Sequence, residues 1–239
     1  MIVLLWQLLW THSVLPHYVV DGPDPAIPLS HGHHESGALP IWEGSREGIA
    51  YSEFNHRVAG LLLLVIGVAE WCQTVRSSSA IWARLLLPGA LGITGLFLLI
   101  WSDHEAWPVG HLTLWQTIFG GDQEILQHKT YGLCAFITAA VEILRRSGRL
   151  RHSAWMVPLP VFAILGGAML FSHTHGSHPA TERIALHHAI MGTLAVIAGV
   201  SRLISAWNSG TRAPAQSCWE LCWAGLVFLI GVELLLYSE

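Results

Sequence analysis

Charged side chains are scarce in this chain. Lys and Arg number 12 and Asp and Glu number 16 among 239 residues, so charged residues make up only 12% of the sequence, whereas apolar residues make up 52%. A soluble globular domain carries about twice that charged fraction. The composition is therefore difficult to reconcile with a solvated globular surface, and it predicts a chain whose main partner is membrane lipid. A formal net charge of −4 gives no reason to expect a nucleic-acid partner.

Sulfur-containing residues are also few, with four Cys and four Met. No cysteine pair lies in the histidine-rich segments, so no disulfide is expected there, and no methionine cluster predicts a copper(I) relay beside them. The sequence also lacks the glycine-rich phosphate loop, the Gly-x-Ser-x-Gly elbow and the His-Glu-x-x-His zinc helix of soluble enzymes. These absences favour a role other than catalysis.

Long apolar runs are the main feature that the sequence does have. Six of them approach the roughly 20 residues needed to cross a bilayer, which predicts an all-α membrane bundle of six transmembrane helices. The runs are 51–75, 82–103, 126–147, 154–174, 184–206 and 217–238. They pair into three predicted hairpins, 51–103, 126–174 and 184–239, that make up a membrane domain of residues 51–239.

Residues 1–50 form a separate N-terminal part in this interpretation. The apolar stretch 2–20 is interrupted by His12, Pro16 and His17, and it fits either a signal peptide or a short membrane segment. A histidine-containing outer segment follows, with His31, His33 and His34.

Basic residues predict the orientation of the helices, because connections that stay in the cytoplasm retain Lys and Arg. Most arginines fall in or beside the connections within the three hairpins: Arg76, Arg84, Arg145, Arg146, Arg149, Arg151, Arg202 and Arg212. The opposite ends of the helices then face the periplasm, in a multi-pass protein of a bacterial inner membrane.

A repeated pattern marks this predicted outer level. Each outward-to-inward helix begins with His-x-x-x-Gly, and each returning helix ends with an aromatic residue, Ser and a polar residue. The histidines are His56, His128 and His188, the glycines are Gly60, Gly132 and Gly192, and the final polar residues are Asp103, His173 and Glu239. Fourteen residues after the histidines stand Glu70, Glu142 and Arg202. The pattern predicts duplication of a hairpin, with each glycine permitting close approach of a neighbouring helix.

Histidines at this level predict a metal site. Twelve of the 15 histidines fall on the predicted outer face or at its helix ends, and imidazole binds copper, zinc, iron and nickel. The expected ligands are His56, His128 and His188, joined by His173, His175 and Asp103. Carboxylates such as Glu53 and Glu124 are expected to orient the imidazoles through their second nitrogen.

Three segments resemble a known family of membrane proteins. SEFNHRVAG at 52–60, WSDHEAWPVG at 101–110 and EILQHKTYG at 124–132, with the histidine-rich loop before Glu182 and the pair His187 and His188, are similar to the copper-resistance protein D (CopD-like) group. The resemblance covers about residues 50–206. It implies copper as the bound metal and a role in copper transport, tolerance or homeostasis, with a periplasmic copper carrier as partner.

Two other functions remain open at this stage. Helix-borne histidines also occur in b-type haem electron carriers, in which two imidazoles bind the iron axially. Alternatively, the bundle is an accessory or assembly subunit of a larger membrane oxidase or monooxygenase complex. Zinc is the alternative metal, because imidazole alone does not select copper.

Overall fold

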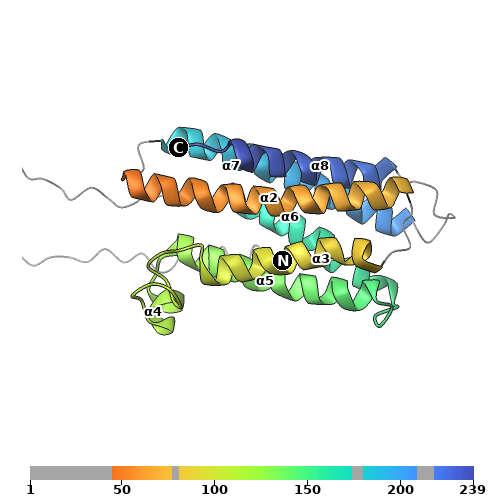
Figure 1. Ribbon diagram of the computed structural model, residues 1–239, viewed down its shortest axis with the longest axis horizontal. Coiled ribbons are helices and arrows are strands. Elements are labelled where there is room, and N and C mark those ends of the chain that lie inside the picture. The colour runs from red at the N-terminus through yellow and green to blue at the C-terminus, as the bar shows by residue number, and fades with distance from the viewer. Residues whose placement is uncertain (1–44, 77–80, 174–179, 209–217) are drawn as a thin grey trace, which may run out of the picture. The chain divides into compact units, whose positions relative to one another are not determined.

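The computed structural model describes residues 45–76, 81–173, 180–208 and 218–239, and Figure 1 shows their arrangement. In these residues every regular element is helical, so the all-α prediction is confirmed for the described part. The elements are α2 (Arg46–Arg76), α3 (Ile81–Ile100), α4 (Leu114–Phe119), α5 (Gln123–Arg146), the 3-10 helix η2 (Ser153–Met156), α6 (Pro158–Leu170), α7 (Thr181–Asn208) and α8 (Cys218–Leu236). The predicted signal or membrane segment, and His31, His33 and His34, lie outside the described residues.

Five segments are long and apolar enough to cross a membrane, which is the pattern of a multi-pass membrane protein. They are Arg46–Val75, Ala83–Ile100, Ser153–Leu170, Thr181–Asn208 and Cys218–Leu236. The predicted run 126–147 corresponds to α5, which is not among the five. Glu124, Lys129, Glu142, Arg145 and Arg146 lie within this helix and lower its hydropathy.

The predicted run 154–174 is divided in the structure. Its first residues form η2, and α6 begins at Pro158, where the missing amide hydrogen costs no helical hydrogen bond. Helix α6 ends at Leu170, so His173 lies just beyond the helix rather than on it.

Six helices contact one another in the order α2, α3, α5, α6, α7, α8 and back to α2. The most extensive packing joins α2 to α8, α3 to α5 and α6 to α7. The two helices of each predicted hairpin also touch, but less extensively. The tightest contacts therefore link different hairpins, an arrangement that chain connectivity alone does not predict.

Paired glycines lie at each of these three tight contacts. A Cβ atom added to either member of a pair would come within 2.7–3.0 Å of the carbonyl oxygen of the other member. The pairs are Gly60 and Gly231 between α2 and α8, Gly132 and Gly95 between α5 and α3, and Gly192 and Gly167 between α7 and α6. The prediction that the His-x-x-x-Gly glycines allow close helix approach is confirmed.

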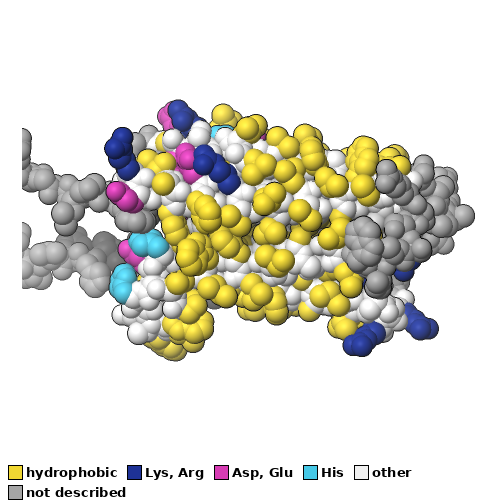
Figure 2. Space-filling view, viewed as in Figure 1, with side chains coloured by type: hydrophobic (Ala, Val, Ile, Leu, Met, Phe, Trp, Pro, Cys, Tyr) yellow, Lys and Arg dark blue, Asp and Glu magenta, His cyan; other side chains and the backbone are white. Residues whose placement is uncertain are grey.

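Hydrophobic side chains cover the middle of the face shown in Figure 2, whereas charged and histidine side chains gather toward its ends. Leu61 and Ile93 are each 58% exposed, and Leu229 is 50% exposed. Exposed aliphatic groups in such numbers suit contact with lipid tails. We call the end with His56, His128, His173 and His188 the histidine end, and the opposite end, with Arg146 and Arg202, the arginine end.

We predict that Gly192→Ala destabilises the bundle, whereas Gly89→Ala does not. Alanine is the better helix former, but a Cβ at Gly192 would approach Gly167 O to 2.7 Å, and one at Gly89 would meet no atom within 4 Å. Overpacking costs about 1–3 kcal/mol, so thermal unfolding of the purified variants in detergent should show a lower midpoint for Gly192→Ala alone. Equal midpoints for the two variants would contradict a packing role for the glycine pair.

Candidate metal site

Four imidazoles meet at the histidine end. The ring centroids of His128 and His173 lie 5.2 Å apart, those of His173 and His188 lie 4.9 Å apart, and those of His188 and His56 lie 6.3 Å apart. These residues come from α5, the residues after α6, α7 and α2 respectively. The rings thus form a continuous row across the bundle, and His188 is the most deeply buried of them, at 2% exposed.

Side-chain contacts fix two of these rings, and His56 Nδ1 lies 2.8 Å from the backbone oxygen of Ser52. His128 Nδ1 lies 2.7 Å from Asp103 Oδ1, and His173 Nδ1 lies 2.6 Å from Gln127 Oε1. Such contacts set ring orientation and raise the basicity of the other nitrogen, as is usual beside metal ligands. The structure therefore gives the orienting role to Asp103 and Gln127, whereas Glu53, which we expected to orient an imidazole, pairs with Arg57 at 2.6 Å.

Asp103 is itself held in the ionised form. Burial raises the pKa of its carboxyl, but the hydrogen bond and charge of His128 outweigh burial, with help from Ser102 and Lys129, so the pKa lies below its usual range. Lys129 Nζ lies 3.3 Å from Asp103 Oδ2, and the Ser102 hydroxyl donates to the same oxygen at 2.5 Å. Asp103 therefore remains an acceptor for His128 at neutral pH.

The repeated helix-end pattern joins the helices at this level. Asn55 Nδ2 donates to Ser102 O at 3.1 Å, and the Ser52 hydroxyl donates to Glu239 at 2.5 Å. The Tyr237 ring stacks on His56 with centroids 3.8 Å apart. The aromatic and serine positions of the pattern thus hold the ends of α3 and α8 against the start of α2.

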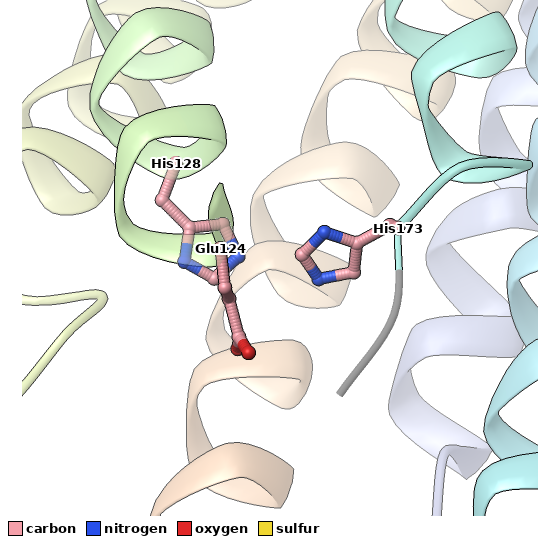
Figure 3. A group of neighbouring side chains, drawn as sticks. All are labelled: Glu124, His128 and His173. Carbon is pink, nitrogen blue, oxygen red and sulfur yellow. The ribbon is translucent and has the colours of Figure 1, made fainter. Parts of the chain in front are cut away.

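Glu124, His128 and His173 form the group whose spacing suits a metal ion. One ligand atom from each lies within 4.8 Å of those of the other two, and all three residues are partly buried. Figure 3 shows the two imidazoles side by side, with the carboxylate of Glu124 close to them. Two imidazole nitrogens and a carboxylate oxygen are suitable donors for copper, zinc or iron.

The predicted ligands divide into several groups. His128 and His173 belong to the group just described, and His188 is the ring neighbour of His173. His56 lies beyond His188 in the row, and Asp103 contacts His128. The predicted ligand His175 lies outside the described residues. Glu124 was expected to orient an imidazole rather than to be a ligand, although it stands one helical turn before His128.

An acidic cavity of about 350 Å³ opens above the imidazoles, and we call it the vestibule. Its wall includes His56, His128 and five carboxylates, and no Lys or Arg is found among its lining residues in the described part of the chain. The carboxylates are those of Asp103, Glu105, Asp122, Glu124 and Glu239. A cleft lined by one sign of charge concentrates ions of the opposite sign, so the vestibule attracts cations toward the imidazoles.

A second cavity, of about 260 Å³, lies on the other side of the imidazoles and extends between the helices; we call it the lumen. His56, His128, His173 and His188 line its histidine end, and the rest of its wall is mainly aliphatic. Met169 and Met191 also line the lumen. No methionine cluster was expected beside the histidines, yet Met191 follows His188 by three residues on α7, a spacing that puts the two side chains on one side of that helix.

Buried ion pairs lie at the arginine end. Arg146 donates to Glu70 at 2.9 Å and to Glu142 at 2.8 Å, and Arg202 lies 3.7 Å from Glu70. The side chains of Glu70, Glu142 and Arg146 are at most 7% exposed. The three residues that stand fourteen positions after the repeated histidines therefore join one network across α2, α5 and α7.

The chain matches no protein-family model, no curated protein and no solved structure.

We expect Glu70→Gln to destabilise the protein by up to about 3–5 kcal/mol, because it removes the carboxylate that Arg146 and Arg202 share and leaves the buried network with excess positive charge. Glu53→Gln is the matched control, since it breaks a pair whose Arg57 side chain is 52% exposed and should cost less than about 1 kcal/mol. Denaturant unfolding in detergent measures both. Similar losses for the two variants would show that the network at the arginine end has no special structural role.

Proposed function

We propose that the protein is a multi-pass protein of a bacterial inner membrane that binds copper at its histidine end and serves in copper transport, tolerance or homeostasis. The observation that carries this proposal is the convergence of imidazoles from four separate parts of the chain beneath an acidic vestibule. Histidines that served only as separate hydrogen-bonding residues at helix ends would not be expected to converge in this way.

We favour copper over zinc for this site. Carboxylate and imidazole groups suit copper(II) and zinc alike, but thioethers select soft ions such as copper(I). Met169 and Met191 line the same cavity as the four histidines. Together with the CopD-like resemblance of 52–60, 101–110 and 124–132, the two thioethers support copper in this site.

The proposal includes the orientation of the bundle in the membrane and the number of its transmembrane helices. The arginines between α5 and α6, and near the ends of α3 and α7 at the arginine end, support a cytoplasmic arginine end and a periplasmic histidine end by the positive-inside rule. Helix α5 is the sixth span, because it packs between α3 and α6 and its central residues 130–141 carry no charge. The three hairpins then descend from one ancestral unit.

The geometry favours a protein that binds copper and transfers it to another protein over one that lets copper ions cross the membrane freely. An ion that left the imidazoles toward the cytoplasm would enter the aliphatic lumen, where desolvation is costly, and would then meet the buried arginines of the far end. The vestibule, by contrast, gives a periplasmic copper carrier direct access to the histidine end.

Replacement of the central imidazoles tests the proposal. We expect His128→Ala and His173→Ala to lower copper affinity by more than about tenfold, because each removes a donor or its immediate neighbour. His111→Ala is the matched control, as His111 is exposed and lines neither cavity. Elemental analysis and competition with a copper chelator, on full-length protein in detergent, give the stoichiometry and affinity. Unchanged copper binding in both variants would refute the proposal.

Asp103→Asn tests how the site is held. The carboxylate fixes the ring of His128, so its loss should weaken copper binding by about 10- to 100-fold while the stoichiometry stays the same. Glu105→Gln removes the same charge from the vestibule without touching an imidazole of the row, and should have a much smaller effect. Equal losses in the two variants would mean that vestibule charge, rather than ring orientation, governs affinity.

A b-type haem is the second candidate function, and the lumen is the observation that favours it. An apolar cavity bordered by imidazoles is the setting in which helix bundles hold a haem ring. His56 and His188, however, are stacked with an interplanar angle of 29°, face to face rather than edge to edge across a slot. A visible spectrum of the purified protein before and after dithionite separates haem from copper.

A further inference from the structure

An uncharged loop rich in aromatic residues follows α3 at the histidine end. Residues 106–120, which include α4, contain no Asp, Glu, Lys or Arg, and we call them the aromatic loop. Trp115 is 71% exposed and Phe119 is 63% exposed. Large apolar side chains gathered on one exposed segment mark a contact with something other than water, so the loop is poorly suited to an aqueous environment.

The exposed apolar side chains of α4 lie on one side of this helix. Thr117 lies on the other side and is buried, and its hydroxyl accepts a hydrogen bond from the Trp107 amide at 3.0 Å. The rings of Trp115 and Phe119 contact each other, with centroids 4.2 Å apart. Helix α4 is therefore amphipathic. Its apolar side consists of Leu114, Trp115, Ile118 and Phe119.

Backbone amides of the aromatic loop are paired within the loop. Gly110 N donates to Ala106 O at 2.8 Å, and Gly120 N donates to Gln116 O at 2.7 Å. At the start of α4, Gln116 N donates to the Thr113 hydroxyl while Thr113 N donates to the Gln116 side chain, which is a capping box. An unpaired amide is costly in lipid, so this internal pairing lowers the cost of moving the loop out of water.

The loop lies at the level where the hydrocarbon core of a bilayer would end. Helix α3 has 20 residues, which corresponds to about 30 Å, the thickness of that core. Exposed Ile100 ends the helix, and exposed Trp101 follows it. Helix α4 contacts α5 and lies to one side of the long helices near this end of α3 (Figure 1), and hydrophobic side chains gather over it in Figure 2. The loop therefore continues the lipid-facing surface at the depth where membrane proteins concentrate tryptophan.

We propose that the aromatic loop is a membrane anchor, which inserts the apolar side of α4 into the headgroup region of the lipid leaflet at the histidine end. Lipid is the occupant because the bilayer is always present at this level, whereas a soluble partner would leave uncharged aromatic side chains in water whenever it was absent. Without Lys or Arg in the loop, insertion depends on apolar burial and not on anionic headgroups. Glu105 and Asp122 flank the loop and line the vestibule, so the anchor holds this wall of the vestibule at the membrane surface.

Fluorine NMR of full-length protein labelled with fluorotryptophan, in nanodiscs of phosphatidylcholine, tests the position of the anchor. The resonance that disappears in Trp115→Phe identifies the reporter. We expect strong broadening of this resonance by a lipid with a nitroxide near the carbonyl end of its acyl chain. A nitroxide at the methyl end of the chain, and a gadolinium chelate in the water, should broaden it weakly. Nanodiscs that also contain phosphatidylglycerol should give the same result.

A carboxylate added to either side of α4 gives matched variants within its first turn. Leu114→Glu places the charge on the apolar side, whereas Gln116→Glu places it on the other side and keeps an acceptor for Thr113 N. We expect Leu114→Glu to reduce broadening of the Trp115 resonance by the lipid nitroxide and to increase its broadening by the chelate, because the cost of desolvating a carboxylate opposes insertion. Gln116→Glu should change neither. The resonances of the other tryptophans report folding, and Ile118→Glu gives the same test if Leu114→Glu does not fold.

Four results would overturn the proposal. Broadening of the Trp115 resonance mainly by the chelate would place the loop in water, and protection from all three reagents would mean that protein covers it, either a second copy or another part of the chain. Equal effects of Leu114→Glu and Gln116→Glu would show that the apolar side of α4 has no special role. Insertion only in the presence of phosphatidylglycerol would show that anionic headgroups, and not apolar burial, hold the loop.

Discussion

Backbone contact at the three glycine pairs determines where the imidazoles lie. Each of His56, His128 and His188 stands one helical turn before a glycine whose partner on the neighbouring helix is also a glycine. Side chains at these positions would hold the helices apart by the width of a methyl group or more. With the backbones in contact, the turns above the glycines are drawn inward, and their imidazoles reach the interior of the bundle rather than lipid.

Much of the architecture could be predicted because lipid leaves few alternatives. Apolar runs of spanning length must be helical to satisfy their backbone hydrogen bonds, so the composition and run lengths were sufficient to place the helices. The alternation of helix direction then put His56, His128, His173 and His188 at one level. The close-packing role of the glycines after the histidines could be predicted in the same way, from spacing and size.

The detailed arrangement of the site could not be predicted, because it depends on which helices are neighbours and how each is rotated. The His-x-x-x-Gly motif groups three histidines, but the ring between His128 and His188 is that of His173, which lies outside a helix. Glu124 joins the donor group and Gln127 contacts His173, although the segment 124–132 that contains both residues does not indicate these roles. The packing of α3 on α5, rather than on its hairpin partner alone, brings Asp103 to His128.

Groups that can bind a metal ion occupy different positions along the bundle according to their chemistry. Carboxylates line the vestibule, imidazoles separate the two cavities, and the thioethers of Met169 and Met191 line the lumen. A doubly charged ion is better stabilised on the carboxylate side, where water and negative charge are available, whereas a singly charged, soft ion loses less by approaching an apolar wall with sulfur donors. If copper occupies the row of imidazoles as proposed, its position between the cavities therefore depends on its oxidation state, and copper(II) lies nearer the side from which a carrier reaches it.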